Sequence, residues 1–82
     1  MRRRYRWASI AALARSTPGV WRQHRDLISI TEHTYRHIRR RVPALRPDEG
    51  GMFRYRRGHH GFDEMGAPVF DLKIQYQPKE TS

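Results

Sequence analysis

The chain of 82 residues contains no cysteine, and only eight acidic residues stand against seventeen Lys and Arg. Without cysteine, neither a disulfide framework nor a thiolate zinc site can form, and a reducing compartment suits such a chain. Long apolar runs are also missing: the segment from Trp7 to Ala14 is interrupted by Ser9 and followed by Arg15. Because it is too short for a signal peptide or a membrane span, we expect a cytoplasmic protein without membrane contacts.

Positive charge is concentrated in the first part of the chain. Residues 1–47 hold twelve Arg and two acids, a balance of +10, whereas residues 48–82 hold five cations and six acids, a balance of −1. Fifteen of the seventeen cations are Arg, which keeps its charge when partly desolvated. Such a localised positive field is typical of proteins that bind a polyanion.

The length predicts one small domain over residues 7–77. A basic flexible arm precedes it at residues 1–6, and a polar tail follows at residues 78–82. Apolar side chains that recur every three or four positions predict a helix over residues 7–16. Thr17-Pro18-Gly19 then ends this helix.

The segment 20–25 is compatible with two structures. A helix is indicated by Thr17 as N-cap followed by proline at the first helical position. A strand is indicated because Val and Trp directly follow a Pro-Gly turn, with Trp21 directed inward and Arg22 and His24 outward. The strand, which we favour, gives a small α+β domain of order α-β-α-β-β, with a three-stranded antiparallel sheet packed by one main helix. The helix gives the order α-α-α-β-β of a winged helix.

The segment 29–42 has the clearest helix signals. Ser29 and Glu32 fit a capping box, and Pro43 ends the helix. Three consecutive Arg occupy the last turn, where cations complement the negative end of the helix dipole. In the winged-helix alternative this helix would enter the major groove of DNA, and the hairpin that follows would form the wing.

Two segments with alternating apolar residues, 52–57 and 69–76, predict an antiparallel hairpin. The connection 58–68 contains three Gly, so we expect a flexible, exposed loop. The residues expected on the outer face of the hairpin are Arg54, Arg56, Asp71 and Lys73. The residues expected in the core are Ile10, Leu13, Trp21, Ile30, Ile38, Val42, Phe53, Tyr55, Phe70, Leu72 and Ile74.

A Pro-Gly-x-Trp step after a short helix, here Pro18 to Trp21, precedes an Arg-bearing helix. An Arg-rich aromatic strand at 52–57 and a final strand at 70–76 follow. Over roughly residues 10–77, this pattern resembles a class of small uncharacterised proteins from phages of actinobacteria. The resemblance implies an α-β-α-β-β fold, a phage origin and a place in the host cytoplasm, but no function. The chain departs from the pattern in its Arg-rich arm and its longer hairpin loop.

The basic residues predict a non-catalytic nucleic-acid-binding protein, with DNA as the expected partner. Its arm and second helix would neutralise phosphates, with affinity that falls as salt rises. Tyr5, Trp7 and Tyr35 lie among the cations and could stack on exposed bases. The alternative is a phage interaction protein that binds an acidic host protein or serves as a minor virion component. The candidate nucleic-acid-binding residues are Arg2, Arg3, Arg4, Arg6, Arg22, Arg25, His33, Arg36, Arg39 and Arg40.

Three patterns suggest metal or nuclease chemistry only superficially. His33 and His37 are one helical turn apart but have no third ligand on their face, and His59-His60 is flanked by Gly rather than held rigidly. Asp63 with Asp71 and Lys73 echoes a metal-dependent nuclease, yet any amphipathic strand alternates in this way. No Ser/His/Asp set or Gly-rich phosphate loop is evident, so we expect no enzyme, no metal and no cofactor.

Overall fold

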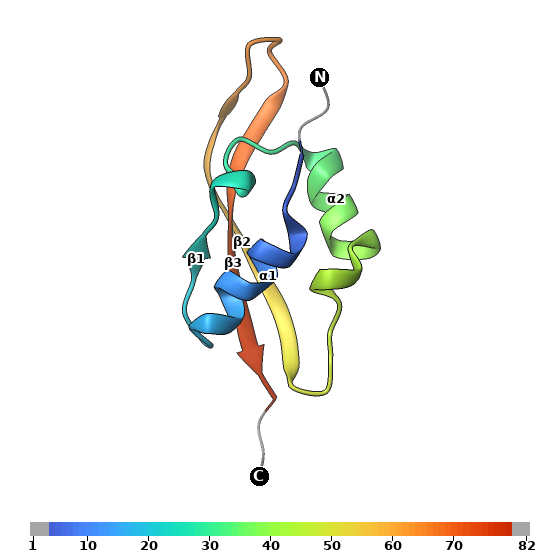
Figure 1. Cartoon of the computed structure of the whole chain (residues 1–82). Helices are drawn as coiled ribbons and strands as arrows, with labels where there is room; N and C mark the ends of the chain where they lie inside the picture. The colour runs from blue at the N-terminus through green and yellow to red at the C-terminus, as the bar shows by residue number, and fades with distance from the viewer. Residues whose placement is uncertain (1–3, 80–82) are drawn as a thin grey trace.

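The structure, a computed structural model, describes residues 4–79. Its order confirms the α-β-α-β-β prediction (Figure 1). The winged-helix alternative is wrong, because residues 22–23 form a strand that pairs with the last strand of the chain. The elements are α1 (Trp7–Ser16), β1 (Arg22–Gln23), the 3-10 helix η1 (Arg25–Leu27), α2 (Glu32–Arg41), the 3-10 helix η2 (Pro43–Leu45), β2 (Gly51–Phe62) and β3 (Pro68–Pro78).

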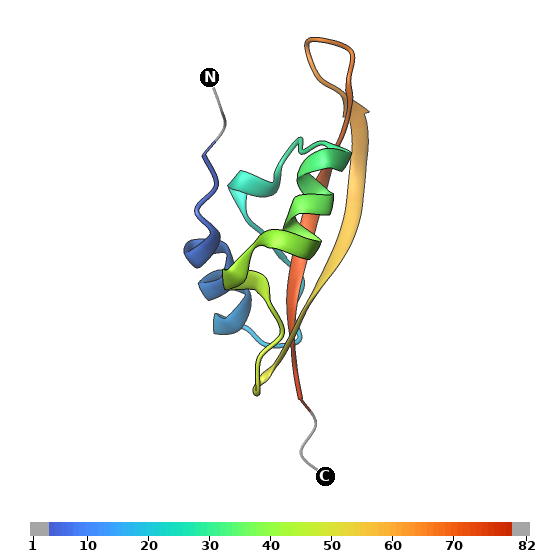
Figure 2. The same ribbon diagram turned by 90° about the vertical axis from the view of Figure 1, so that its right-hand side faces the viewer.

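The three strands form an antiparallel sheet in the order β1-β3-β2, so the last strand of the chain is central. The β2–β3 register pairs Tyr55 with Ile74, and β1 pairs Arg22 with the same Ile74. Figure 2 shows α1 and α2 together on one side of the sheet. Within residues 4–79, no helix covers the opposite face, which we call the open sheet face.

The core lies between the helices and β3, and most of the predicted core is confirmed. Every second residue of β3, from Phe70 to Tyr76, is buried against the helices. Leu13, Trp21 and Tyr55 were expected inside but are only partly buried, with Tyr55 packed against the core. The buried hydrophobic residues are Ile10, Ala11, Ala14, Leu27, Ile30, Ile38, Val42, Leu45, Phe53, Val69, Phe70, Leu72, Ile74 and Tyr76.

The orientation of the first strand differs from the prediction. Since Arg22 pairs with buried Ile74 and side chains alternate along a strand, Arg22 lies on the helix side of the sheet edge and Trp21 on the open sheet face. His24, expected to point outward, is 8% exposed. A strand of two residues has too few alternating positions to show from sequence which side chains face the core. The burial of His24 depends on its hydrogen bonds, which hydrophobicity does not reveal.

The start of α2 also differs from the prediction. Ser29 has φ 53°, in the left-handed region, and it does not cap the helix. Thr31 is the N-cap, and its side chain accepts a hydrogen bond from the Thr34 N–H at 3.3 Å. Glu32 is therefore free of the predicted capping box, and its carboxylate binds Arg57 of β2 at 2.8 Å. This ion pair ties the start of α2 to the hairpin.

The hairpin is longer and more ordered than the sequence indicates. The strand β2 continues through residues 58–62 of the predicted loop 58–68 and β3 begins at Pro68, so the loop is shorter than expected, although none of its residues is buried. One extra residue enters β2 between Gly58 and Gly61, a β-bulge in which His59 has φ 49°. The Asp63 carboxylate accepts hydrogen bonds from the N–H groups of Met65 and Ala67 and closes the turn.

The closed end of this hairpin extends beyond both helices (Figures 1 and 2). Two large apolar side chains stand exposed there, Phe62 at 76% and Met65 at 91%. We call residues 62–67 the hairpin tip. Among residues 4–79, no helix is long and apolar enough to cross a membrane.

Candidate nucleic-acid interface

The α2 helix presents one cationic face to solvent. His33, Arg36, His37 and Arg40 follow the i, i+3, i+4, i+7 spacing that aligns side chains along a helix, whereas Ile38 on the opposite side is buried. Together with Arg41, these exposed side chains line a shallow depression. We call these five residues the α2 cationic face.

Nothing within the described chain balances this charge fully. The helix holds four Arg and one acid, and that acid, Glu32, is 2.8 Å from Arg57 but 4.0 Å from Arg36. In residues 4–79, Arg40 and Arg41 form no ion pair, and the Arg36 side chain is 73% exposed. Like charges one turn apart destabilise a helix by a few tenths of a kcal/mol. The cluster therefore does not arise from a requirement of folding.

The N-terminal arm borders this face. The Tyr5 and Trp7 rings are stacked, with centroids 4.8 Å apart and planes within 8°. The Trp7 ring lies 6.2 Å from the His37 ring of α2. The structure thus brings the arm to the helix, and exposed Arg4 precedes the aromatic pair. Arg2 and Arg3 lie outside the described residues.

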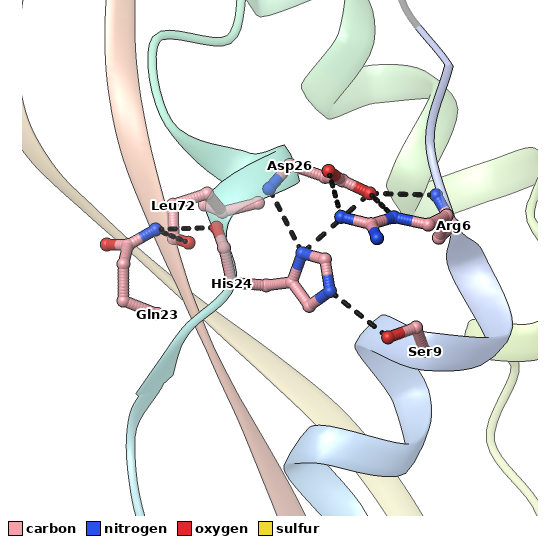
Figure 3. A network of polar contacts seen from close by, with 6 residues as sticks. All are labelled: Arg6, Ser9, Gln23, His24, Asp26 and Leu72. Atoms are coloured by element: carbon pink, nitrogen blue, oxygen red, sulfur yellow. Dashed lines mark hydrogen bonds and ion pairs between the residues drawn. The ribbon is translucent and has the colours of Figure 1, made fainter.

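Arg6, a predicted phosphate ligand, is exposed but paired with a carboxylate of the chain itself. Its Nη2 lies 3.1 Å from Asp26 Oδ1, its Nε donates to Asp26 Oδ2 at 3.2 Å, and its backbone N–H donates to the same Oδ2 at 2.9 Å (Figure 3). These hydrogen bonds lower the pKa of Asp26 to about 2. We call this bidentate pair the arm clamp. It leaves Arg6 matched by a carboxylate, unlike the arginines of α2.

Three other predicted ligands also lie apart from the α2 cationic face. Arg22 is half-buried at the sheet edge and donates to Thr17 Oγ1 at 2.9 Å. Arg25 is exposed on η1. Arg39 points along another side of α2, with its guanidinium 5.8 Å from the centre of the Tyr35 ring. Of the ten predicted residues, the structure brings His33, Arg36 and Arg40 together.

A Ser-His-Asp arrangement that the sequence did not predict surrounds the arm clamp (Figure 3). His24 Nε2 lies 3.3 Å from Ser9 Oγ, and His24 Nδ1 accepts the Asp26 backbone N–H at 3.0 Å. A neutral imidazole whose Nδ1 is an acceptor carries its proton on Nε2. Nε2 is then a donor toward Ser9, the reverse of what a general base needs.

The surroundings of this His fit a structural role. Burial lowers the pKa of His24, which favours the neutral ring. The Asp26 carboxylate is bound by Arg6 and lies 3.8 Å from Nδ1. The three residues therefore join α1 to η1 and its N-cap, His24, through hydrogen bonds.

The patterns weighed for metal chemistry do not assemble in the described residues. Between residues 4 and 79, no group of three or more His, Asp or Glu side chains is placed to hold a metal ion. Asp63 is used in the hairpin tip, whereas Asp71 accepts the Ser29 N–H at 2.9 Å. Asp63 is thus held in the hairpin turn, apart from Asp71 and Lys73 on β3.

Sequence reasoning left a second group of cations out of the candidate site. Arg54, Arg56 and Lys73 are exposed on the open sheet face, as their alternation predicts, and Arg56 stands directly opposite Lys73. Trp21 lies on the same face, with the Arg54 guanidinium 5.9 Å from its ring centre. The sequence did contain a signal for this group, because Arg54 and Arg56 alternate along one predicted strand and Lys73 lies on the same face of the other.

Comparison of the chain with protein-family models, curated proteins and solved structures found no match.

Proposed function

We propose that this chain is a non-catalytic nucleic-acid-binding protein whose α2 cationic face and arm contact the phosphate backbone. The observation that carries the proposal is the cluster of three arginines and two histidines on one exposed helix face, which no carboxylate of the described chain fully neutralises. Polyanions supply the missing negative charge at regular intervals, and they release counterions when the cations bind.

The arrangement favours contacts to phosphates over contacts to bases. The helix has ten residues, about 15 Å of length, and its cations point outward in one row. Base reading would require this helix to enter the major groove, as in the winged helix that this chain does not form. Contacts confined to phosphates position a protein on nucleic acid but read no sequence. We therefore propose binding with little sequence preference.

The test is a fluorescence-anisotropy titration with labelled duplex and single-stranded DNA at several salt concentrations. We expect wild-type binding to weaken log-linearly with salt, and we expect duplex binding to be lost in Arg36→Glu/Arg40→Glu. The matched control is Arg46→Glu/Lys79→Glu, which changes net charge equally at exposed positions away from α2. Equal losses in the two variants would show general charge attraction and overturn the assignment to α2. No binding at low salt by the folded wild type would overturn the function itself.

The source of the chain is proposed on the resemblance alone. A phage-encoded protein acting in the host cytoplasm would meet nucleic acid directly. An acidic host protein is the alternative ligand for the α2 cationic face, because carboxylates also form bidentate contacts with Arg. A pull-down from host lysate treated with nuclease would distinguish the two ligands: retention of an acidic protein by wild type, and not by Arg36→Glu/Arg40→Glu, favours the alternative.

A second candidate function, interaction with a protein, is favoured by the hairpin tip. Phe62 and Met65 are the two most exposed large hydrophobic residues of the described chain, and they belong to the hairpin tip, which extends beyond the helices. Asp63 and Glu64 stand between them, so phosphate is an unsuitable partner for this end. Loss of a pull-down partner in Phe62→Ser/Met65→Ser, with DNA binding intact, would support an interaction protein.

A further inference from the structure

We propose that the open sheet face is a second site, which binds single-stranded nucleic acid by stacking on Trp21 and by phosphate contacts to Arg54, Arg56 and Lys73. Both helices cover the other side of the sheet, so this face is separate from the α2 cationic face (Figure 2). The proposal stands independently of the function proposed for α2.

The arrangement of the cations on this face destabilises the fold. Arg56 and Lys73 are directly opposite each other across the β2–β3 pair, where like charges destabilise a sheet. Within residues 4–79, Arg54, Arg56 and Lys73 form no ion pair. The side chain of Asp71, the acid of β3, accepts the Ser29 N–H. A bound anion would relieve this repulsion.

A hollow beside these cations has the polar lining that a phosphate needs. Gln23, Arg56, His59 and Lys73 line it, together with Asp71 as its one carboxylate. Arg56 and Lys73 offer several hydrogen-bond donors to one anion, whereas the amide nitrogen of Gln23 already donates to the Leu72 and His24 carbonyls. The hollow lies at the end of the open sheet face that continues into the hairpin.

The other end of the face supplies a stacking surface. Trp21 is partly exposed, and the Arg54 guanidinium lies 5.9 Å from its ring centre, above the central strand. Gln75 lies on that strand opposite Arg54, 7% exposed. Its Nε2 donates to the Gly19 carbonyl at 2.8 Å, but its Oε1 is buried without a hydrogen-bond donor from the described residues.

This orphaned acceptor points to what the face takes up. A buried acceptor without a donor is destabilising, so a ligand that brings a donor to it gains affinity. If a base stacks on Trp21, it displaces the Arg54 guanidinium from the ring, and Arg54 can then bind a phosphate. The edge of the base brings hydrogen-bond donors to the Gln75 side-chain oxygen. Aromatic stacking combined with a cationic track is the general means of binding single strands. Duplex bases are stacked inside the helix and cannot reach Trp21, and the carboxylate side chains of an acidic peptide have no ring to stack on it.

The test isolates Trp21 as the only tryptophan by working in a Trp7→Phe background, because the chain has two. A short oligothymidylate should quench Trp21 emission, whereas a duplex of equal length should not. In Arg54→Gln/Arg56→Gln, single-strand affinity should fall by about tenfold or more. Arg36→Gln/Arg40→Gln removes the same charge from α2 and should retain the quenching.

Three results would overturn the proposal. They are unchanged Trp21 emission while the oligonucleotide binds, quenching of equal size by duplex or by polyglutamate, and equal loss of quenching in the α2 variant. If Arg54→Gln/Arg56→Gln fails to fold by circular dichroism, Lys73→Gln replaces it, since that side chain is exposed and unpaired in the described chain. The function proposed for α2 is tested only by DNA binding of the α2 variants, whereas the second site is tested by Trp21 emission. Failure of one proposal can therefore be told from failure of the other.

Discussion

The arm clamp and the α2 cationic face both use arginine, but only one of them is neutralised within the protein. In the clamp, the Arg6 guanidinium meets the Asp26 carboxylate in two hydrogen bonds. On α2, Arg36 has only a 4.0 Å approach to a carboxylate that another arginine holds more closely. A paired arginine stabilises the fold, whereas an unpaired row repels itself and attracts anions. Pairing, rather than the number of arginines, therefore identifies the candidate site.

The largest effect should come from reversing charge on α2. In Arg36→Glu/Arg40→Glu, we expect DNA affinity at low salt to fall by about a hundredfold or more, because two phosphate contacts become repulsive. The melting temperature should fall by only a few degrees, because one like-charge pair replaces another and only the long, exposed Arg36–Glu32 ion pair is lost. Anisotropy and circular dichroism on the same samples give both readouts. If the variant were unfolded at the temperature of the binding assay, the loss of binding would reflect stability, and the contrast between α2 and the arm clamp would fail.

A change in the arm clamp should act mainly on stability. Asp26→Asn removes the charge that Arg6 binds, and we expect the melting temperature to fall by roughly 5 °C. The folded protein should still bind DNA, because the α2 face is unaltered. Thermal melts followed by circular dichroism check the first expectation, and anisotropy checks the second. An unchanged melting temperature would show that the clamp contributes nothing.

The arm clamp also predicts that the free energy of unfolding falls at acidic pH. The pKa of Asp26 is lowered from 3.8 to about 2, so the stabilisation is present above 3.8 and lost as pH falls through about 2. The pKa of Asp48 is lowered too, by its hydrogen bond from Tyr76, but Asp48 remains in wild type and in Asp26→Asn. The difference between the urea-unfolding curves of these two proteins should therefore shrink across this window. A constant difference would contradict the ion pair.

A smaller pH effect should come from buried His24. Burial lowers its pKa below 6.5, so below that pH the unfolded chain binds a proton that the folded chain does not. The free energy of unfolding should decline as pH falls from 6.5 to the folded pKa. Urea unfolding of wild type, His24→Gln and the exposed control His33→Gln should show this slope lost only in His24→Gln. Its loss in the control as well would assign the slope to another group.

The smallest effect is expected at the hairpin tip. Phe62→Ser/Met65→Ser alters side chains that are 76% and 91% exposed, so stability should change by no more than about 0.5 kcal/mol. DNA affinity should stay within twofold of wild type on the α2 assignment. Urea unfolding and anisotropy measure both quantities. A large loss of DNA affinity would place the tip, rather than α2, at the interface.

The sequence predicted the fold because its strongest signals are local. Alternation along 69–76 and the breaks at Pro18-Gly19 and Pro43 limited the possible orders to two. The clustering of Arg36 and Arg40 also follows from helical spacing alone. The arm clamp did not, because its partners are twenty positions apart and become neighbours only when η1 folds against α1.

Other errors have similar causes. Ser29 and Thr31 are both acceptable caps, and only the left-handed backbone at Ser29 decides between them. The hairpin loop seemed flexible because of its glycines, but Asp63 organises the turn with its own carboxylate. Trp21 was assigned to the core because it is large and aromatic, whereas the register turns it to the open sheet face.

The most direct test of the central claim is the salt dependence of duplex binding by wild type and Arg36→Gln/Arg40→Gln. If both arginines neutralise phosphates, the slope of log K against log salt should be smaller in the variant by about 1.8, roughly 0.9 for each contact removed. The charge-matched Arg46→Gln/Lys79→Gln should keep the wild-type slope. Equal slopes in wild type and the α2 variant would contradict the claim that α2 meets the phosphate backbone.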